Sequence, residues 1–206
     1  MKKLEGKVAI VTASTKGIGL ASAQALAREG ATVYLAARSQ ELANEVIAEM
    51  KKKGEIAKFV YFNSSEVETY TTMVKYAAEA EGRLDILVNN YGKTNVDLDK
   101  NLTDGDTDEF FRILKDNVES VYLPCKAAIP YMEKCGGGSI VNISTIGSVV
   151  PDLSRMSYCV SKAAINSLTQ NIAIQYAGKN IRCNAVLPGL IATNAAIENM
   201  SNEFRT

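Results

Sequence analysis

The 206-residue sequence contains no histidine. This absence excludes Ser-His-Asp and Cys-His nucleophile systems, histidine-ligated zinc and haem, and any histidine acid or base. General acid-base chemistry in this chain must therefore use Tyr, Lys, Asp, Glu or Cys. We also predict no metal site, because a stretch that resembles the start of a calcium loop (Asp97, Asp99, Asn101) has Leu102 where that loop requires glycine.

Net charge, long apolar runs and paired cysteines are missing as well. Lys+Arg and Asp+Glu both number 23, which excludes a general attraction to nucleic acid or to an anionic membrane. No span approaches the about 20 apolar residues of a membrane helix, and the run at 8–11 is too short for a signal peptide. The four cysteines form no C-x-x-C and show no disulfide framework. We therefore expect a cytoplasmic protein with reduced thiols.

Short apolar runs alternate with helical patterns along the whole chain. We predict strands at residues 7–12, 32–37, 56–62, 84–89, 139–144 and 181–187. We predict helices at residues 20–29, 39–53 (with Ser39 as N-cap), 66–81, 107–134 and 157–176, and a polar segment shortly before Thr206 could begin a further helix. The strands are continuously apolar, which favours a mostly parallel, doubly wound α/β sheet of the Rossmann-like kind. No linker or repeat divides residues 1–206, so we expect a single domain.

The first strand leads into a glycine-rich turn, T-A-S-T-K-G-I-G, at residues 12–19. Such a turn lets backbone N–H groups approach a pyrophosphate, and the helix that follows adds positive potential. A strict G-x-G-x-x-G is absent, and the phosphate loop of nucleotide triphosphatases is excluded because Lys16 precedes Gly17. A turn with a purely structural role is the alternative.

The second predicted strand ends in Ala37, Arg38 and Ser39, without an acid. Dinucleotide folds place an acid there for a free ribose 2′-hydroxyl and an arginine for a 2′-phosphate. Arg38 can bind phosphate through two N–H groups or stack on adenine, and Lys16 in the first turn supplies a second cation. Two solvated surface charges are the alternative, but we predict NADP(H) rather than NAD(H).

Tyr158 and Lys162 lie four residues apart on the predicted helix 157–176. That spacing places both side chains on one face, about 5–6 Å apart at Cβ. A neighbouring cation favours phenolate, so we expect Lys162 to lower the pKa of Tyr158. The alternative is a half-buried ring beside a solvated amine, which is common on helices.

The turn at 12–19, N-N-Y-G at 89–92 and Tyr158-x-x-x-Lys162 occur in the order of the classical short-chain dehydrogenase/reductase family, which the chain resembles over nearly its whole length. Three departures stand out. Ala13 replaces the first glycine of the turn, Tyr91 replaces an alanine, and Thr145 stands where the family has its catalytic serine. Threonine keeps that hydroxyl, whereas the adjacent Ser144 would point the other way.

The resemblance implies hydride transfer between NADP(H) and a secondary alcohol or ketone, with a role for each matching position. The implied catalytic residues are Tyr158 as acid-base, Lys162, Thr145 holding the substrate oxygen, and Asn117 orienting a water that continues the proton path from Lys162. The implied cofactor residues are Thr15, Lys16, Gly17, Ile18, Gly19, Arg38, Ser39, Asn63, Asn90, Tyr158, Lys162, Ile191 and Thr193. The implied substrate residues are Thr145, Tyr158 and Tyr91.

Residues 89–103, 110–124 and 139–152 are similar to a bacterial subgroup of that family, the NADP-dependent 7α-hydroxysteroid dehydrogenases of bile-acid metabolism, which share the departures at Tyr91 and Thr145. The resemblance implies a steroid or bile-acid substrate. A 3-oxoacyl or small-ketone reductase, and an NADP(H)-binding protein without turnover, remain alternatives. Family members continue through a substrate-loop helix and a last strand that help to build a dimer or tetramer, so we expect residues 1–206 to lack a C-terminal part.

Overall fold

The computed structural model describes residues 2–151 and 155–193. Its centre is a six-stranded sheet in the order β3-β2-β1-β4-β5-β6, and every pair of neighbouring strands is parallel. The strands are β1 (Val8–Thr12), β2 (Thr32–Ala37), β3 (Ile56–Tyr61), β4 (Ile86–Asn89), β5 (Gly138–Ile143) and β6 (Ile181–Val186). This is the doubly wound order, and it confirms the predicted fold class.

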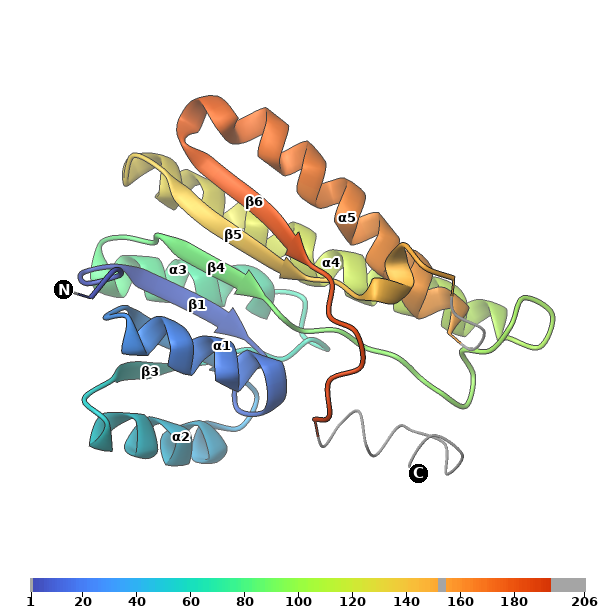
Figure 1. The fold of residues 1–206 in the computed structure, drawn as a ribbon, viewed down its shortest axis with the longest axis horizontal. Coiled ribbons are helices and arrows are strands. Elements are labelled where there is room, and N and C mark those ends of the chain that lie inside the picture. The colour runs from blue at the N-terminus through green and yellow to red at the C-terminus, as the bar shows by residue number, and fades with distance from the viewer. Residues whose placement is uncertain (1, 152–154, 194–206) are drawn as a thin grey trace.

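Five α-helices connect the strands and cover the two faces of the sheet (Figure 1). Helices α1 (Gly17–Arg28) and α2 (Gln40–Lys52) lie on one face. Helices α3 (Thr69–Glu81), α4 (Thr107–Lys134) and α5 (Met156–Tyr176) lie on the other. Two short 3-10 helices, η1 (Ile146–Ser148) and η2 (Ala177–Lys179), follow β5 and α5.

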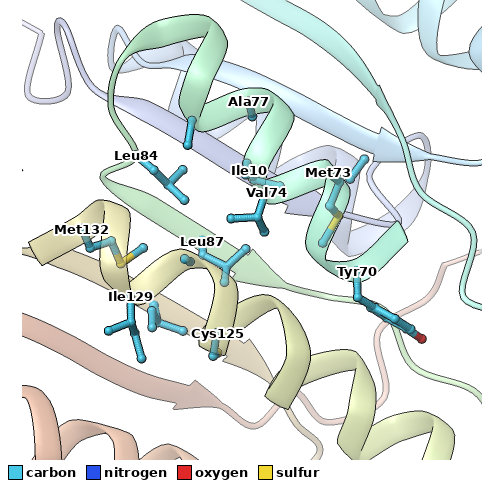
Figure 2. Close-up of a cluster of buried hydrophobic side chains, with 14 of the residues drawn as sticks. Ile10, Tyr70, Met73, Val74, Ala77, Leu84, Leu87, Cys125, Ile129 and Met132 are labelled. Carbon is cyan, nitrogen blue, oxygen red and sulfur yellow. The ribbon is translucent and has the colours of Figure 1, made fainter. Parts of the chain in front are cut away.

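Each face of the sheet packs its own hydrophobic core. The larger core joins the sheet to α3, α4 and α5, and Figure 2 shows Leu87 of β4 between Val74 of α3 and Ile129 of α4. The smaller core packs Ala23 and Ala27 of α1 and Met50 of α2 against β1 and β2. Both cores are made mainly of aliphatic side chains, which fits a parallel sheet buried on both faces.

Most predicted elements agree with the structure to within a few residues. Helix α4 has the predicted bounds, and Ser39 caps α2 by accepting a hydrogen bond from the Leu42 N–H at 3.2 Å. Helix α1 begins at Gly17, three residues before the predicted start, so the glycine-rich turn forms its first turn. The polar segment shortly before Thr206, which could begin a further helix, falls largely outside the described residues.

The prediction that every strand is continuously apolar is wrong for the two edge strands. Along β6 the exposure alternates, with Ile181 and Cys183 buried and Arg182 and Asn184 exposed. Strand β3 also exposes alternate residues at its start. Successive side chains of a strand point to opposite faces of the sheet, so this alternation shows that one face of each edge strand is covered more fully than the other.

The carboxyl ends of all six strands meet at one edge of the sheet, because the strands are parallel. The segments that follow β1, β4, β5 and β6 therefore gather at this edge, which is where α/β sheets bind ligands. Across the described part of the chain, no helix has both the length and the apolarity to cross a membrane.

Candidate active site

A cavity of about 1670 Å³ opens at the carboxyl edge of the sheet. It exceeds the roughly 300–1,000 Å³ of a pocket for one drug-sized ligand. Its wall combines the first turn, the start of the loop after β4, the segment after β5, the beginning of α5 and the segment after β6. Eight predicted cofactor residues line it: Lys16, Gly17, Ile18, Asn90, Tyr158, Lys162, Ile191 and Thr193.

The two ends of the glycine-rich turn pack so closely that Gly19 has no room for a side chain. A Cβ on Gly19 would lie 2.4 Å from the Ala13 carbonyl oxygen and 2.6 Å from Asn90 Nδ2. Ala13 has a φ of +52°, in the left-handed region that favours glycine. Ala13 therefore adopts the left-handed backbone conformation of the glycine that the family has at this position, although it carries a methyl side chain.

Asn90 holds this turn in place from the neighbouring strand β4. Its Nδ2 donates to the carbonyl oxygens of Thr12 at 3.0 Å and Ala13 at 3.2 Å. Its backbone N–H donates to Thr12 Oγ1 at 2.9 Å. The side chain that the resemblance assigns to cofactor binding thus supports the turn directly.

The start of α1 fits a pyrophosphate. Its N-cap residue, Lys16, makes no side-chain cap hydrogen bond, and Lys16, Gly17 and Ile18 all line the cavity. The N-termini of α2 and α4 are capped instead by Ser39 and Asp106. An uncapped helix start beside a cavity offers N–H donors and positive potential to an anion. When bound there, a dinucleotide would be held by the first turn and by the uncapped N–H groups of α1.

Four predicted cofactor residues, Thr15, Arg38, Ser39 and Asn63, do not line this cavity, and Gly19 lies buried beneath it. Arg38 and Lys16 are exposed, and neither takes part in the ion pairs formed within 2–151 and 155–193. Asn63 Nδ2 donates to Glu66 Oε1 at 2.7 Å, so this amide is held by its own loop. A direct contact of Asn63 with adenine stays a prediction.

Helix α5 brings Tyr158 and Lys162 to the cavity wall on one face, as their spacing predicts. Lys162 Nζ lies 5.7 Å from the centre of the Tyr158 ring and donates to the Ile143 carbonyl oxygen at 2.7 Å. The Lys162 side chain is 2% exposed, and burial lowers its pKa to about 8. The Lys162 amine is thus held at the end of β5 in a buried environment that disfavours its charged form.

The expectation that Lys162 lowers the pKa of Tyr158 is wrong for this arrangement. Burial raises the pKa of Tyr158 above its ordinary value, and the positive charge that opposes the rise is that of Arg155. A phenol with a raised pKa stays protonated near neutrality. The site therefore presents Tyr158 as a proton donor.

Thr145 follows β5 and lines the cavity, whereas Ser144 beside it points its hydroxyl at the backbone. Ser144 Oγ donates to the Lys162 carbonyl oxygen at 3.2 Å and is buried. Thr145 is half-buried, and its Oγ1 accepts a long hydrogen bond of 3.4 Å from the Gly147 N–H. Its hydroxyl hydrogen thus remains available for a substrate oxygen.

Asn117 of α4 is fully buried beneath the loop that follows β4. Its Oδ1 accepts from the Lys93 N–H at 2.7 Å, and its Nδ2 donates to the Lys93 carbonyl oxygen and to Ser161 Oγ, both at 2.9 Å. The side chain thus fastens the loop to α4 and α5. The water that the resemblance assigns to Asn117 stays a prediction.

Tyr91 lines the cavity but also packs on the core. Its ring makes an edge contact with Phe62, with 5.9 Å between ring centres. The next residue, Gly92, approaches Lys162 so closely that a Cβ there would lie 2.9 Å from Nζ. Tyr91 and Gly92 together form the wall opposite the α5 side chains.

Sequence reasoning assigned no site role to Arg155 or Asp99. Arg155 lines the cavity three residues before Tyr158, and its charge acts on that phenol. Asp99 was considered only as part of a rejected calcium loop, but its carboxylate accepts from the backbone N–H groups of Ser157 and Tyr158. The position of Arg155 just before the helix could have drawn attention to it. No spacing signal links Asp99 to residues almost 60 positions away.

The described residues contain no group of three or more His, Cys, Asp or Glu side chains that could hold a metal ion. All four cysteines are outside disulfides. The side chains that line the cavity offer phenol, amine, guanidinium, thiol, amide and hydroxyl groups.

Comparison with known proteins gives consistent matches in sequence. The profile of the short chain dehydrogenase family matches residues 7–203. A 7alpha-hydroxysteroid dehydrogenase from Clostridium sardiniense is 81% identical over 205 residues, which are 100% of this chain and 78% of that protein. A 7alpha-hydroxysteroid dehydrogenase from Paraclostridium sordellii is 50% identical over 100% of this chain and 77% of its own length.

Solved structures match the fold. A putative short-chain alcohol dehydrogenase from Sinorhizobium meliloti superposes with a TM-score of 0.86 at 33% identity, covering 98% of this chain and 77% of that one. An NAD+-bound xylitol dehydrogenase superposes with a TM-score of 0.85 at 32% identity, covering 92% of this chain and 72% of that one.

Proposed function

This chain belongs to the short-chain dehydrogenase family, and from that premise we propose that it transfers a hydride between NADP(H) and the 7α-position of a bile acid. As an oxidoreductase of this family it uses a nicotinamide dinucleotide and acts on a small molecule. The choice of NADP(H) and of a bile acid is the part that we propose.

One observation carries the proposal. The uncapped start of α1, the hydroxyl of Thr145 and the pair of Tyr158 and Lys162 face a single cavity. That cavity is large enough for a dinucleotide and a second molecule. A cofactor at the first turn and a substrate beside Tyr158 would thus lie in the same cavity.

In the proposed reaction Tyr158 exchanges a proton with the substrate oxygen. Its raised pKa keeps the phenol protonated, which suits donation to a ketone during reduction. Thr145 would hold the same oxygen through its hydroxyl. A nicotinamide cofactor, when bound, would supply or accept the hydride. Lys162, held by the Ile143 carbonyl, would lie beside the nicotinamide ribose.

Two free cations support NADP(H) over NAD(H). Arg38 directly follows β2, and Lys16 is the N-cap of α1. Ser39 accepts the α2 cap hydrogen bond with its lone pair, so its O–H can still donate to a phosphate. No acid stands directly after β2, at Arg38 or Ser39, to bind a free 2′-hydroxyl.

Replacing Arg38 by Asp tests the cofactor choice. We expect Arg38→Asp to weaken NADP(H) binding by at least tenfold more than NAD(H) binding, because only the 2′-phosphate needs the guanidinium. Fluorescence titration of both cofactors measures the ratio. Arg28→Asp, which makes the same charge change at the far end of α1, should leave the ratio unchanged. Equal losses for the two cofactors in Arg38→Asp would contradict the choice.

The cavity wall near Tyr158 supports an apolar substrate with an acidic group. Ile146, Val150, Pro151 and Leu190 line it together with Arg155. A bile acid combines a steroid ring system with a carboxylate. Relatives that match the whole chain are named as 7alpha-hydroxysteroid dehydrogenases.

Following NADPH absorbance with a 7-keto bile acid and with an acetoacetyl thioester tests the substrate. We expect turnover of the bile acid, with kcat/KM at least a hundredfold above that for the thioester. Preference for the thioester would favour a 3-oxoacyl reductase. Cofactor binding without oxidation by either substrate would favour a binding protein without turnover. Either result would overturn the proposal.

We further propose a cytoplasmic homo-oligomer. Large apolar side chains on α4 and α5 are exposed, among them Phe111 at 62% and Ile174 at 78%. Exposed apolar groups on neighbouring helices are typical of subunit contacts. Light scattering of the purified protein should give a multiple of the chain mass; a monomer at micromolar concentration would contradict this part.

A further inference from the structure

Helix α5, which carries Tyr158, begins without a cap of its own. Its N-cap residue, Arg155, makes no side-chain cap hydrogen bond, and its first turn contains no acid. The neighbouring helix α4 is capped locally, because Asp106 Oδ1 accepts from the Glu109 N–H at 2.7 Å. The first N–H groups of α5 therefore need an acceptor from elsewhere in the chain.

Asp99, in the loop after β4, supplies that acceptor. Its Oδ1 accepts from the Ser157 N–H at 2.8 Å and its Oδ2 from the Tyr158 N–H at 3.0 Å. These are the second and third residues of the helix, and an ordinary N-cap oxygen serves one of them. The carboxylate serves both and places a negative charge at the positive end of the helix. Asp99 is 4% exposed, so this contact is shielded from water.

The loop that carries Asp99 is fastened on both sides of this contact. On one side Asn117 of α4 binds the N–H and the carbonyl of Lys93. On the other side the Asp106 N–H donates to the Leu98 carbonyl at 3.2 Å, and within the loop the Asp99 N–H donates to the Asn95 carbonyl at 2.7 Å. The carboxylate is therefore held in a fixed position relative to α4.

We propose that Asp99 is a positioning residue, which fixes the first turn of α5 and so places the Tyr158 phenol for proton transfer. It acts through the backbone N–H of Tyr158 and does not itself contact the substrate. The inference rests on the proposed acid-base role of Tyr158. It assigns a positioning role to a residue of the loop after β4 that does not itself line the cavity.

The test compares two capping aspartates, Asp99→Ala and Asp106→Ala. Each variant loses one helix cap, so each should lower the melting temperature. Only Asp99→Ala should disturb Tyr158. We expect kcat per chain that binds NADPH to fall about tenfold in Asp99→Ala and to stay within twofold in Asp106→Ala. Normalising to bound NADPH removes any unfolded fraction, which a purely structural loss would produce.

A fall of less than threefold in Asp99→Ala would overturn the inference. Should that variant bind no NADPH because it does not fold, Asp99→Asn keeps one acceptor oxygen and is judged by the same threefold limit. Amide hydrogen exchange at Ser157 and Tyr158 provides a readout that needs no activity. We expect exchange at least tenfold faster in either Asp99 variant, and unchanged exchange would also overturn the inference. If the wild-type protein shows no turnover, the proposed function is refuted. The exchange rates would then still show whether Asp99 caps α5.

Discussion

At the scale of single residues, the most unusual group is the buried amine of Lys162. Its pKa falls from 10.5 to about 8 because burial disfavours the charged form. Between these two pH values the unfolded chain binds a proton that the folded chain has lost. The free energy of unfolding therefore rises with pH in this window, and below pH 8 the buried charge destabilises the fold.

We expect Lys162→Met to be more stable than the wild type at pH 7 by about 2 kcal/mol. A pKa lowered from 10.5 to about 8 corresponds to roughly 3 kcal/mol of destabilisation at pH 7. The hydrogen bond to Ile143, which the variant loses, offsets about 1 kcal/mol of the expected gain. Urea unfolding at several pH values measures the difference, which should shrink between pH 8 and 10.5. Lys75→Met, at an exposed site on α3, is the control and should show no such trend. A difference that is constant with pH would show that burial of the ammonium is not its cause.

Ala13 is a second unusual residue, because its side chain disfavours the backbone conformation that it adopts. With a φ of +52° it adopts the left-handed conformation, which costs an L-residue about 1–2 kcal/mol. Ala13→Gly removes that cost but adds chain entropy to the unfolded state, so we expect a net stabilisation of about 0.5–1 kcal/mol. Thermal or urea unfolding checks this value. Ala48→Gly in the exposed middle of α2 should instead destabilise by about 1 kcal/mol, and a like sign for both variants would refute the strain at Ala13.

At the scale of elements, the first turn of α1 is shaped by the missing side chain of Gly19. Alanine normally stabilises a helix by about 1 kcal/mol relative to glycine. Here its Cβ would lie 2.4 Å from the Ala13 carbonyl oxygen, so the backbone would have to move. We expect Gly19→Ala to lower the free energy of unfolding by about 2 kcal/mol and to weaken cofactor binding at least tenfold.

The matched control for Gly19→Ala is Gly178→Ala in η2, where an added Cβ meets no atom within 4 Å. This variant should change stability by less than about 0.5 kcal/mol. Denaturation and cofactor titration of both proteins provide the comparison. Unchanged cofactor affinity in Gly19→Ala would mean that the turn does not hold the dinucleotide.

The elements themselves could be predicted from the sequence because their signals are local. Apolar runs placed the strands, and Ser39 marked the start of α2. The pair of Tyr158 and Lys162 could also be placed, because a four-residue spacing on a helix defines one face. Contacts between distant segments could not be predicted in this way. Asp99 meets α5 because the loop after β4 crosses to it, and nothing in the local pattern of either segment encodes that crossing.

The pKa values of the site residues likewise could not be predicted from the sequence. Proximity of Lys162 suggested a lower pKa for Tyr158, but burial raises this pKa, and the charge that opposes the rise is that of Arg155. The three-dimensional position of Lys162 Nζ, on the Ile143 carbonyl, decides where its charge acts.

At the scale of the whole molecule, the parallel sheet explains why residues from all parts of the chain meet. The segments after β1, β4, β5 and β6 all leave the sheet at the same edge, and each contributes a wall of the cavity. The two cores hold the strands that fix those walls, and Figure 2 shows part of the larger core. In the proposed function, the first half of the chain would supply the turn that binds the dinucleotide, and the second half would supply the reacting groups.

The central claim is that the phenol of Tyr158 transfers the proton in this reaction. Its most direct test is Tyr158→Phe, which removes only the hydroxyl, assayed with NADPH and a 7-keto bile acid. We predict that turnover falls at least a thousandfold while the dissociation constant of NADPH stays within threefold of the wild type. Turnover within tenfold of the wild type would contradict the account.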